Sequence, residues 1–197
     1  MLFRSGAVFN TAQVRPGESV VVTGCGGVGL NAIQGARISG AGAIIAVDVV
    51  ESKLELAKGL GATHTVDAAH VDPVAEVARL TDGGADHVVE SSGVPAVAEQ
   101  AIEMVGIGGK VTLVGLPAQG VRIAFDPTVL IPNEKTIAGS HVGSLRPRID
   151  IPRYVDMFLR GQLDLDTLVS KRITLDEVNE GFDAMQRGEV ARGVIVF

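Results

Sequence analysis

Apolar and polar positions alternate in two patterns along most of this chain. Apolar runs of strand length span residues 19–24, 43–48, 63–66, 86–90, 109–115 and 136–141. Segments with helical spacing of apolar residues separate most of them, at residues 28–39, 51–60, 73–80 and 95–104. The first, fifth and sixth runs are rich in Val, Ile, Leu and Thr, which is typical of parallel strands covered on both faces. The pattern therefore predicts an α/β fold, a doubly wound parallel sheet with helices on both faces.

Proline and acidic residues mark where several helices begin. Asp72 is placed to cap a helix with Pro73 at its first position, and Pro95 begins the next helix in the same way. Residues 151–160 form another helical pattern, which Pro152 is predicted to begin. Proline suits such positions because the first N–H groups of a helix have no partner within it.

The alternation of strands and helices ends near residue 142. Beyond it, Thr174 and Glu177 have the spacing of a capping box, in which each side chain accepts the other residue's free N–H. The helix that follows carries an apolar stripe made of Val178, Phe182 and Met185. Residues 193–197 form a terminal strand, whose partner strand the sequence does not identify.

The turn after the first strand-like run carries the strongest functional signal. Gly24, Gly26 and Gly29 form a Gly-x-Gly-x-x-Gly pattern between a strand and a helix, and Asp48 ends the next strand. A glycine-rich turn alone is weak evidence, since 25 of the 197 residues are glycine. The preceding strand, the following helix and the acid in register together match the fingerprint of a dinucleotide-binding Rossmann fold.

Each position in this turn has a physical reason. Gly24 allows a tight exit from the strand, Gly26 keeps side chains away from a pyrophosphate, and Gly29 lets the helix lie close to the sheet. The helix start at Gly27 and Val28 directs free N–H groups and the positive end of the helix dipole at that pyrophosphate.

Asp48 is predicted to choose the cofactor. Its carboxylate would accept hydrogen bonds from the adenosine ribose hydroxyls. It would also repel a 2′-phosphate, because juxtaposed like charges cost several kcal/mol. The predicted cofactor is therefore NAD rather than NADP.

Composition argues against several classes of partner. Seventeen Lys and Arg stand against 23 Asp and Glu, a net charge of −6 without basic clusters, which disfavours nucleic acid. No apolar run reaches the roughly 18 residues that cross a bilayer, so no membrane partner is expected. The start, Met1–Ser5, is too short and too soon interrupted for a secretory signal. With one cysteine no internal disulfide can form, which favours a cytoplasmic location.

Several further segments carry distinctive sequences. They are Val14–Glu18 leading into the glycine turn, Lys53–Lys58, Leu60–Thr63, Glu90–Gly93, Gly108–Gly115 and Glu189–Phe197. Together they resemble the zinc-dependent medium-chain alcohol dehydrogenases over nearly the whole chain. The resemblance implies that residues 1–142 form a Rossmann NAD-binding domain, which begins with an N-terminal helix. Residues 143–197 would then be a C-terminal helical extension with a terminal strand, which in the family returns to the catalytic domain.

The resemblance also implies roles for individual residues. The residue matching Lys53 lies near the adenosine ribose, and Arg192 reaches the pyrophosphate, where a guanidinium makes paired, charge-assisted hydrogen bonds. Backbone groups around Val114, Ser140 and Val142 hold the nicotinamide carboxamide. Ser91 follows a strand at the carboxyl edge of the sheet, where it either lines the cofactor crevice or is a simple turn residue.

The zinc ligands of the family are missing from this sequence. A catalytic zinc needs three protein ligands, but the only cysteine, Cys25, lies inside the glycine turn. The histidines are scattered, at His64, His70, His87 and His141. In the family the ligands and most of the substrate pocket belong to an N-terminal catalytic domain. We therefore expect no zinc, no catalytic residues, and a chain that binds NAD but does not oxidise alcohols alone.

A homodimer is expected for two reasons. Family members pair subunits through the region matching residues 121–141. In addition, the C-terminal apolar faces lose part of their cover without a catalytic domain, and large exposed apolar patches usually bind a partner. These faces include Phe158, Leu159, Phe182 and Met185.

Three other functions are compared with the residues of the glycine turn and Asp48. A stand-alone NAD-sensing module would need an identical cofactor site. A zinc-free quinone reductase relative shares the domain order but usually prefers the phosphorylated cofactor, which Asp48 disfavours. A methyltransferase usually has an acidic residue just before the glycines, where this chain has Val22 and Thr23.

Overall fold

Six parallel strands form the central sheet, in the order β3-β2-β1-β4-β5-β6. The strands are β1 (Ser19–Thr23), β2 (Ala43–Asp48), β3 (His64–Asp67), β4 (Ala85–Glu90), β5 (Val105–Leu113) and β6 (Thr136–Gly139). This computed structural model describes residues 2–187 and 192–197. The order reverses between β1 and β4, which confirms the predicted doubly wound Rossmann topology.

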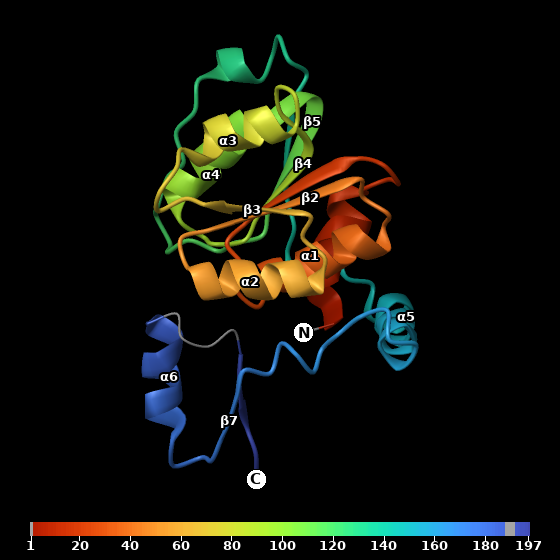
Figure 1. Cartoon of the computed structure of the whole chain (residues 1–197), viewed down its shortest axis with the longest axis vertical. Helices are drawn as coiled ribbons and strands as arrows, with labels where there is room; N and C mark the ends of the chain where they lie inside the picture. Colours follow the sequence, from red (N-terminus) through yellow and green to blue (C-terminus); the bar gives the residue numbers. More distant parts are fainter. Residues whose placement is uncertain (1, 188–191) are drawn as a thin grey trace.

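Helices cover both faces of the sheet. Figure 1 shows α1 and α2 on one face and α3 and α4 on the other. These helices are α1 (Gly29–Ile38), α2 (Glu51–Leu60), α3 (Pro73–Leu80) and α4 (Pro95–Met104). Alternate residues of β1 enter the two cores: Val20 and Val22 pack on the α1 side, and Val21 packs on the other. The caps match the sequence, since Asp72 accepts the Val74 and Ala75 N–H groups and α4 begins at Pro95.

The fifth strand begins earlier than its sequence pattern indicates. It starts at Val105 rather than residue 109, and its pairing with β4 shifts register between Ala85 and His87. The intervening Ile107 is 82% exposed. A short apolar pattern does not reveal such an irregularity, because an extra residue in a bulge interrupts the alternation of side chains between the two faces of the strand.

The N-terminal segment forms two short helices, the 3₁₀ helix η1 (Leu2–Ser5) and the π-helix η2 (Ala7–Ala12). Lys110 of β5 fastens the end of η2, because its Nζ donates to the carbonyls of Thr11 and Ala12 at 3.3 and 3.4 Å. The N-terminal segment therefore packs on the sheet beside β5.

Helix α5 (Pro147–Leu159) corrects the predicted helix start. The first helical residue is Pro147, and Pro152 lies inside the helix, so the prediction that Pro152 begins the helix is wrong. Only Asp150 and Tyr154 are buried on α5, whereas Val155 and Leu159 are exposed. The face predicted to be apolar is thus largely uncovered in this chain.

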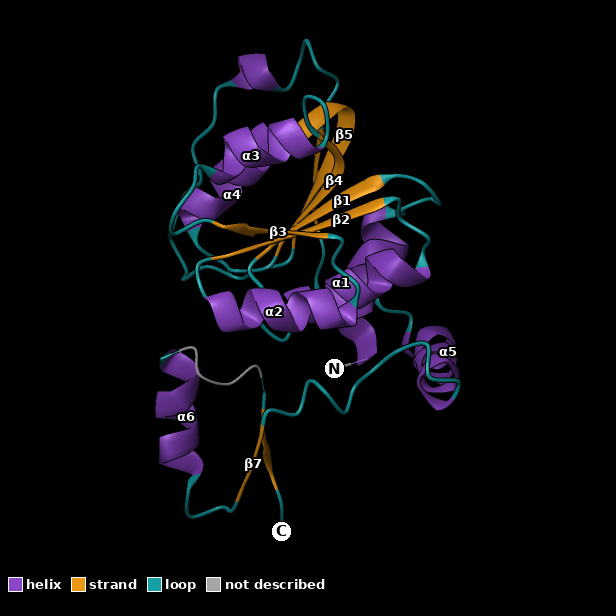
Figure 2. Cartoon of the chain, in the orientation of Figure 1, coloured by secondary structure: helices purple, strands orange, loops and turns teal. Residues whose placement is uncertain are grey.

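The C-terminal segment forms its own small unit. The terminal strand β8 (Gly193–Ile195) pairs in parallel with β7 (Lys171–Ile173), a strand that the sequence patterns did not indicate. Figure 2 shows this pair and α6 (Val178–Gln186) outside the layers of the main sheet. The capping box before α6 is half formed, since Thr174 N–H donates to Glu177 while the Glu177 N–H donates to the Thr174 carbonyl.

Hydrogen bonds from α1 tie the chain between α5 and β7 to the main sheet domain. The side-chain amide of Gln34 in α1 donates to the Asp164 carbonyl and accepts its N–H, both at 2.7 Å. Leu168 nearby is fully buried in the core under α1. In the part of the chain that the structure describes, none of the helices has the length and apolar character to span a membrane.

Candidate functional site

A cleft of about 500 Å³ lies at the carboxyl ends of β1, β2 and β4. This is the edge where the strand order reverses, the usual ligand position in open α/β sheets. Among the residues that line the cleft are Gly24, Gly26, Asp48, Lys53 and Ser91, all singled out by the sequence. Apolar side chains form its other walls, including Val47, Val49, Ala68, Val94, Val97 and Met104.

The three glycines differ in what requires them. Gly24 has a φ of +85°, a conformation that other residues rarely adopt. A Cβ on Gly29 would lie 1.9 Å from the Gly24 carbonyl oxygen, so close packing of α1 excludes any side chain there. A Cβ on Gly26 would meet nothing within 4 Å and its φ is ordinary. The protein itself does not need glycine at position 26, which lines the cleft.

The start of α1 presents unpaired donors. Among the described residues, no acceptor pairs with the backbone N–H of Gly26, Gly27 or Val28. Their carbonyls are used, since Gly26 accepts from Leu30, and Val28 accepts from Ala32. Free N–H groups at a helix N-terminus, together with the dipole, form a binding site for an anion.

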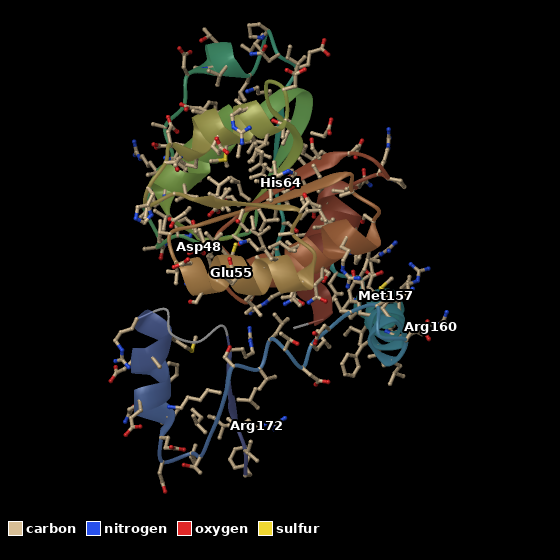
Figure 3. All side chains as sticks on the ribbon, viewed as in Figure 1. Asp48, Glu55, His64, Met157, Arg160 and Arg172 are labelled. Atoms are coloured by element: carbon tan, nitrogen blue, oxygen red, sulfur yellow. The ribbon has the colours of Figure 1, made fainter. Side chains whose placement is uncertain are left out.

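Asp48 holds the turn and the next helix together. Its Oδ2 accepts the Cys25 N–H at 2.6 Å, and its Oδ1 accepts the N–H groups of Val49 and Val50 at 2.8 and 3.0 Å. Figure 3 shows Asp48 at the end of the sheet where α2 begins. A carboxylate has about four acceptor positions. Three are occupied, which leaves about one on Oδ2 for a ligand hydroxyl.

The loop after β4 supports the glycine turn. Ser91 Oγ donates to the carbonyls of Thr23 and Gly24 at 3.0 and 2.7 Å, so its hydroxyl is engaged within the protein. Ser91 thus lines the cleft and also holds the glycine turn, and its place beside a cofactor stays a prediction. Glu90 is 1% exposed, and its Oε1 accepts from Ser92 N–H, Ser92 Oγ and Gly93 N–H. The sequence showed Glu90 within a distinctive segment but gave no local sign of this role.

The segment after β6 has an unusual backbone. Val142 has a φ of +53°, which for a β-branched residue costs on the order of 1–3 kcal/mol. Ser140 N–H donates to the Leu113 carbonyl, and Val114 N–H donates to the backbone carbonyl of Glu90. Ser140 and Val114 therefore continue adjacent strands at the carboxyl edge of the sheet. None of these three residues lines the 500 Å³ cleft. They lie at the end of the sheet beyond it.

Two other expected residues differ in placement. Lys53, on the first turn of α2, lines the cleft. Arg192 does not line it; its backbone bonds to Ser170 beside the small C-terminal sheet. The residues just before Arg192, 188–191, lie outside the described part of the chain. A contact between Arg192 and a pyrophosphate therefore stays a prediction.

The residues do not fit a zinc site. Within residues 2–187 and 192–197, no group of three His, Cys, Asp or Glu side chains is placed to hold a metal. Cys25 is buried, and burial, followed by the nearby charge of Asp48, raises the pKa of its thiol to about 12. His87 is paired with Glu18 at 2.8 Å, between Nε2 and Oε2.

Comparison with known proteins identifies the family. A family model described as zinc-binding dehydrogenase matches residues 27–160. The chain belongs to the zinc-binding dehydrogenase family. It is 40% identical over 193 residues to alcohol dehydrogenase 1 of Trifolium repens, covering 96% of this chain and 50% of that protein.

Solved structures of this family share the fold. Benzyl alcohol dehydrogenase from Acinetobacter calcoaceticus superposes with a TM-score of 0.95 at 40% identity, over 98% of this chain and 53% of that one. A zinc-binding dehydrogenase from Sinorhizobium meliloti 1021, bound to NADP, gives 0.84 at 30% identity, over 91% and 52%. The chain thus spans about half the length of the dehydrogenases that it matches, and it corresponds to their nucleotide-binding part.

Proposed function

We propose that this zinc-binding dehydrogenase chain binds NAD in the cleft between β1, β2 and β4. The observation that carries the proposal is Gly26, which lines the cleft at a position where neither backbone conformation nor packing requires glycine. A pyrophosphate beside the free N–H groups of Gly26, Gly27 and Val28 would explain why a residue without a side chain stands there. The volume of about 500 Å³ and the apolar walls suit the adenosine half.

Asp48 supports NAD over NADP. Its remaining acceptor position on Oδ2 faces a cleft in which a ribose 2′-hydroxyl can donate and a 2′-phosphate would be repelled. The S. meliloti relative was crystallised with NADP. The proposed preference for NAD therefore rests on this carboxylate and not on the relatives. Lys53 and Ser91, on the walls of the same cleft, and Arg192 complete the proposed adenosine and pyrophosphate contacts.

The nicotinamide end is proposed to lie over β5 and β6. Backbone groups at Val114, Ser140 and Val142 continue the carboxyl ends of these neighbouring strands. The chain would thereby supply the cofactor-binding half of an alcohol or aldehyde dehydrogenase-like oxidoreductase, which transfers hydride between an alcohol and NAD. Its side chains would orient the cofactor, and within residues 2–187 and 192–197 they form no group placed to hold a metal. We therefore propose that the chain lacks alcohol oxidation activity alone.

Two further features belong to the proposal. We place the protein in the cytoplasm, in keeping with its one buried, reduced cysteine. We also propose a homodimer, through residues 121–141 around the edge strand β6 or through the exposed C-terminal apolar faces. Exposed apolar side chains support both surfaces: Phe125 and Ile131 on the first, and Leu159, Phe182 and Met185 on the second. Light scattering at micromolar concentration should give twice the chain mass, and a monomeric mass would contradict the dimer.

Calorimetric titration of the chain with NAD, NADP and S-adenosylmethionine tests the function. NAD should bind most tightly and S-adenosylmethionine should not bind. Family membership already favours a dinucleotide over the methyl donor. Preference for NADP would favour the quinone reductase alternative, and absence of NAD binding would contradict the proposal. Turnover by the pure chain after adding alcohol and zinc would contradict its incomplete chemistry. A stand-alone NAD-sensing module would also bind NAD without turnover, so the two are separated by inspecting the coding region upstream of Met1 for a catalytic domain with Cys and His ligands.

A further inference from the structure

A left-handed turn follows the edge strand β6. Val142, Gly143 and Ser144 have φ values of +53°, +68° and +48° in succession. Two of them are not glycine, so the local sequence does not favour this conformation. Such strain persists only where the surrounding structure imposes it, and it is concentrated at ligand-binding positions.

Side chains of η2 impose the conformation from more than 125 residues away. Thr11 Oγ1 donates to Ser140 Oγ at 2.8 Å and lies 2.7 Å from Ser144 Oγ, so one hydroxyl joins both ends of the turn. Asn10 Nδ2 donates to the Gly143 carbonyl at 3.1 Å and lies 3.4 Å from the Ser144 carbonyl. These contacts use the turn's carbonyls and hydroxyls.

The backbone of the N-terminal segment lies directly against the same turn. A Cβ on Gly6 would lie 2.5 Å from the Gly143 carbonyl oxygen, so the two backbones touch. Lys110 fixes the far end of η2 through the Thr11 and Ala12 carbonyls. Thr11 is therefore clamped between the body of the sheet and the turn.

We propose that Thr11, assisted by Asn10, is a positioning residue for the nicotinamide end of the cofactor. It holds residues 140–144 in the left-handed conformation that directs their backbone groups at the carboxamide. The inference rests on the proposed function, in which this segment binds that amide. Thr11 does not touch the cofactor itself; its effect passes through the turn.

ADP-ribose separates this role from a general structural one, because it shares every part of NAD except the nicotinamide. The affinities of both ligands are measured by calorimetry for the wild-type chain, Thr11→Val, Thr11→Ser and Thr81→Val. Thr81 is the matched control, since its hydroxyl also makes two hydrogen bonds, to Val77 and Gly84, but at the end of α3.

Wild type should bind NAD more tightly than ADP-ribose. Thr11→Val should weaken the affinity for NAD by about three- to tenfold and change the affinity for ADP-ribose by less than about twofold. This is the size expected when lost hydrogen bonds disturb the turn at one end of the ligand. Thr11→Ser keeps the hydroxyl and should restore NAD affinity. Thr81→Val should change neither ligand. Hydrogen exchange of the amides at 140–144 should be faster in Thr11→Val alone.

Each alternative result has a distinct meaning. An equal loss of affinity for NAD and ADP-ribose in Thr11→Val would show that Thr11 only stabilises the fold, and it would overturn the inference. So would unchanged NAD affinity or unchanged hydrogen exchange. If wild type itself shows no preference for NAD over ADP-ribose, the proposed carboxamide site fails, and the positioning role fails with it.

Discussion

The backbone N–H of Cys25 donates a 2.6 Å hydrogen bond to Oδ2 of Asp48. This bond joins the middle of the glycine turn to the end of the neighbouring strand β2. The carboxylate proposed to select the cofactor therefore also shapes the turn that would bind the pyrophosphate.

Replacing Asp48 with Ala should reduce the preference for NAD over NADP by at least about tenfold, because the charge that repels a 2′-phosphate is lost. Asp67→Ala is the matched control. Asp67 pairs with Asp48 in register and also accepts a backbone N–H, but it does not line the cleft. Calorimetry with both cofactors checks the prediction, and unchanged selectivity in Asp48→Ala would mean that another group discriminates.

Two glycine variants should behave in opposite ways. Gly26→Ala should leave the free energy of unfolding within about 0.5 kcal/mol of wild type. It should weaken the affinity for NAD at least about tenfold. Gly29→Ala should destabilise the fold by about 2–4 kcal/mol, because its Cβ would overlap the Gly24 carbonyl. Urea unfolding and calorimetry measure both effects. Tight NAD binding by Gly26→Ala would remove the main support for the proposed site.

Asp150 should make stability depend on pH. Hydrogen bonds from the Arg146 guanidinium and N–H hold the pKa of Asp150 below its ordinary 3.8. A lowered pKa in the folded state stabilises the fold above pH 3.8, and this contribution is lost as pH falls through the folded value. Asp150→Asn should therefore lower the free energy of unfolding by about 1 kcal/mol at pH 7 and by less below pH 3.

Asp156→Asn serves as the control for that variant on the same helix. Asp156 pairs with Arg160 at the same i,i+4 spacing, but both side chains are largely exposed. Its replacement should change the free energy of unfolding by less than about 0.5 kcal/mol at either pH. An equal loss in both variants would show that burial of Asp150 is unimportant.

Cys25 should be unreactive in the folded chain. With a pKa of about 12 instead of 9.0, its thiolate is about a thousandfold less populated at pH 8. Alkylation by iodoacetamide should be at least about a hundredfold slower in the native protein than in urea. Comparable rates would show that the glycine turn opens readily.

The Rossmann elements were predictable because each depends on local signals. Apolar runs, the caps at Asp72 and Pro95, and the glycine turn with Asp48 each appear within a short window, and the structure places them as expected. Errors arose where two local signals competed. Pro147 and Pro152 both suit a helix start. The earlier one is favoured by the local hydrogen bond from Arg146 N–H to Asp150 and by the long-range bond from Asn10 to the same carboxylate.

By itself the sequence determined the layered α/β fold and the position of a dinucleotide turn, since backbone propensity and periodic burial are properties of neighbouring residues. Only the tertiary structure decided that β8 pairs with β7 and that Thr11 meets Ser140 and Ser144. Such contacts join residues far apart in the chain. They become visible only when packing brings two backbones together, because no local pattern records which distant hydroxyl will meet which turn.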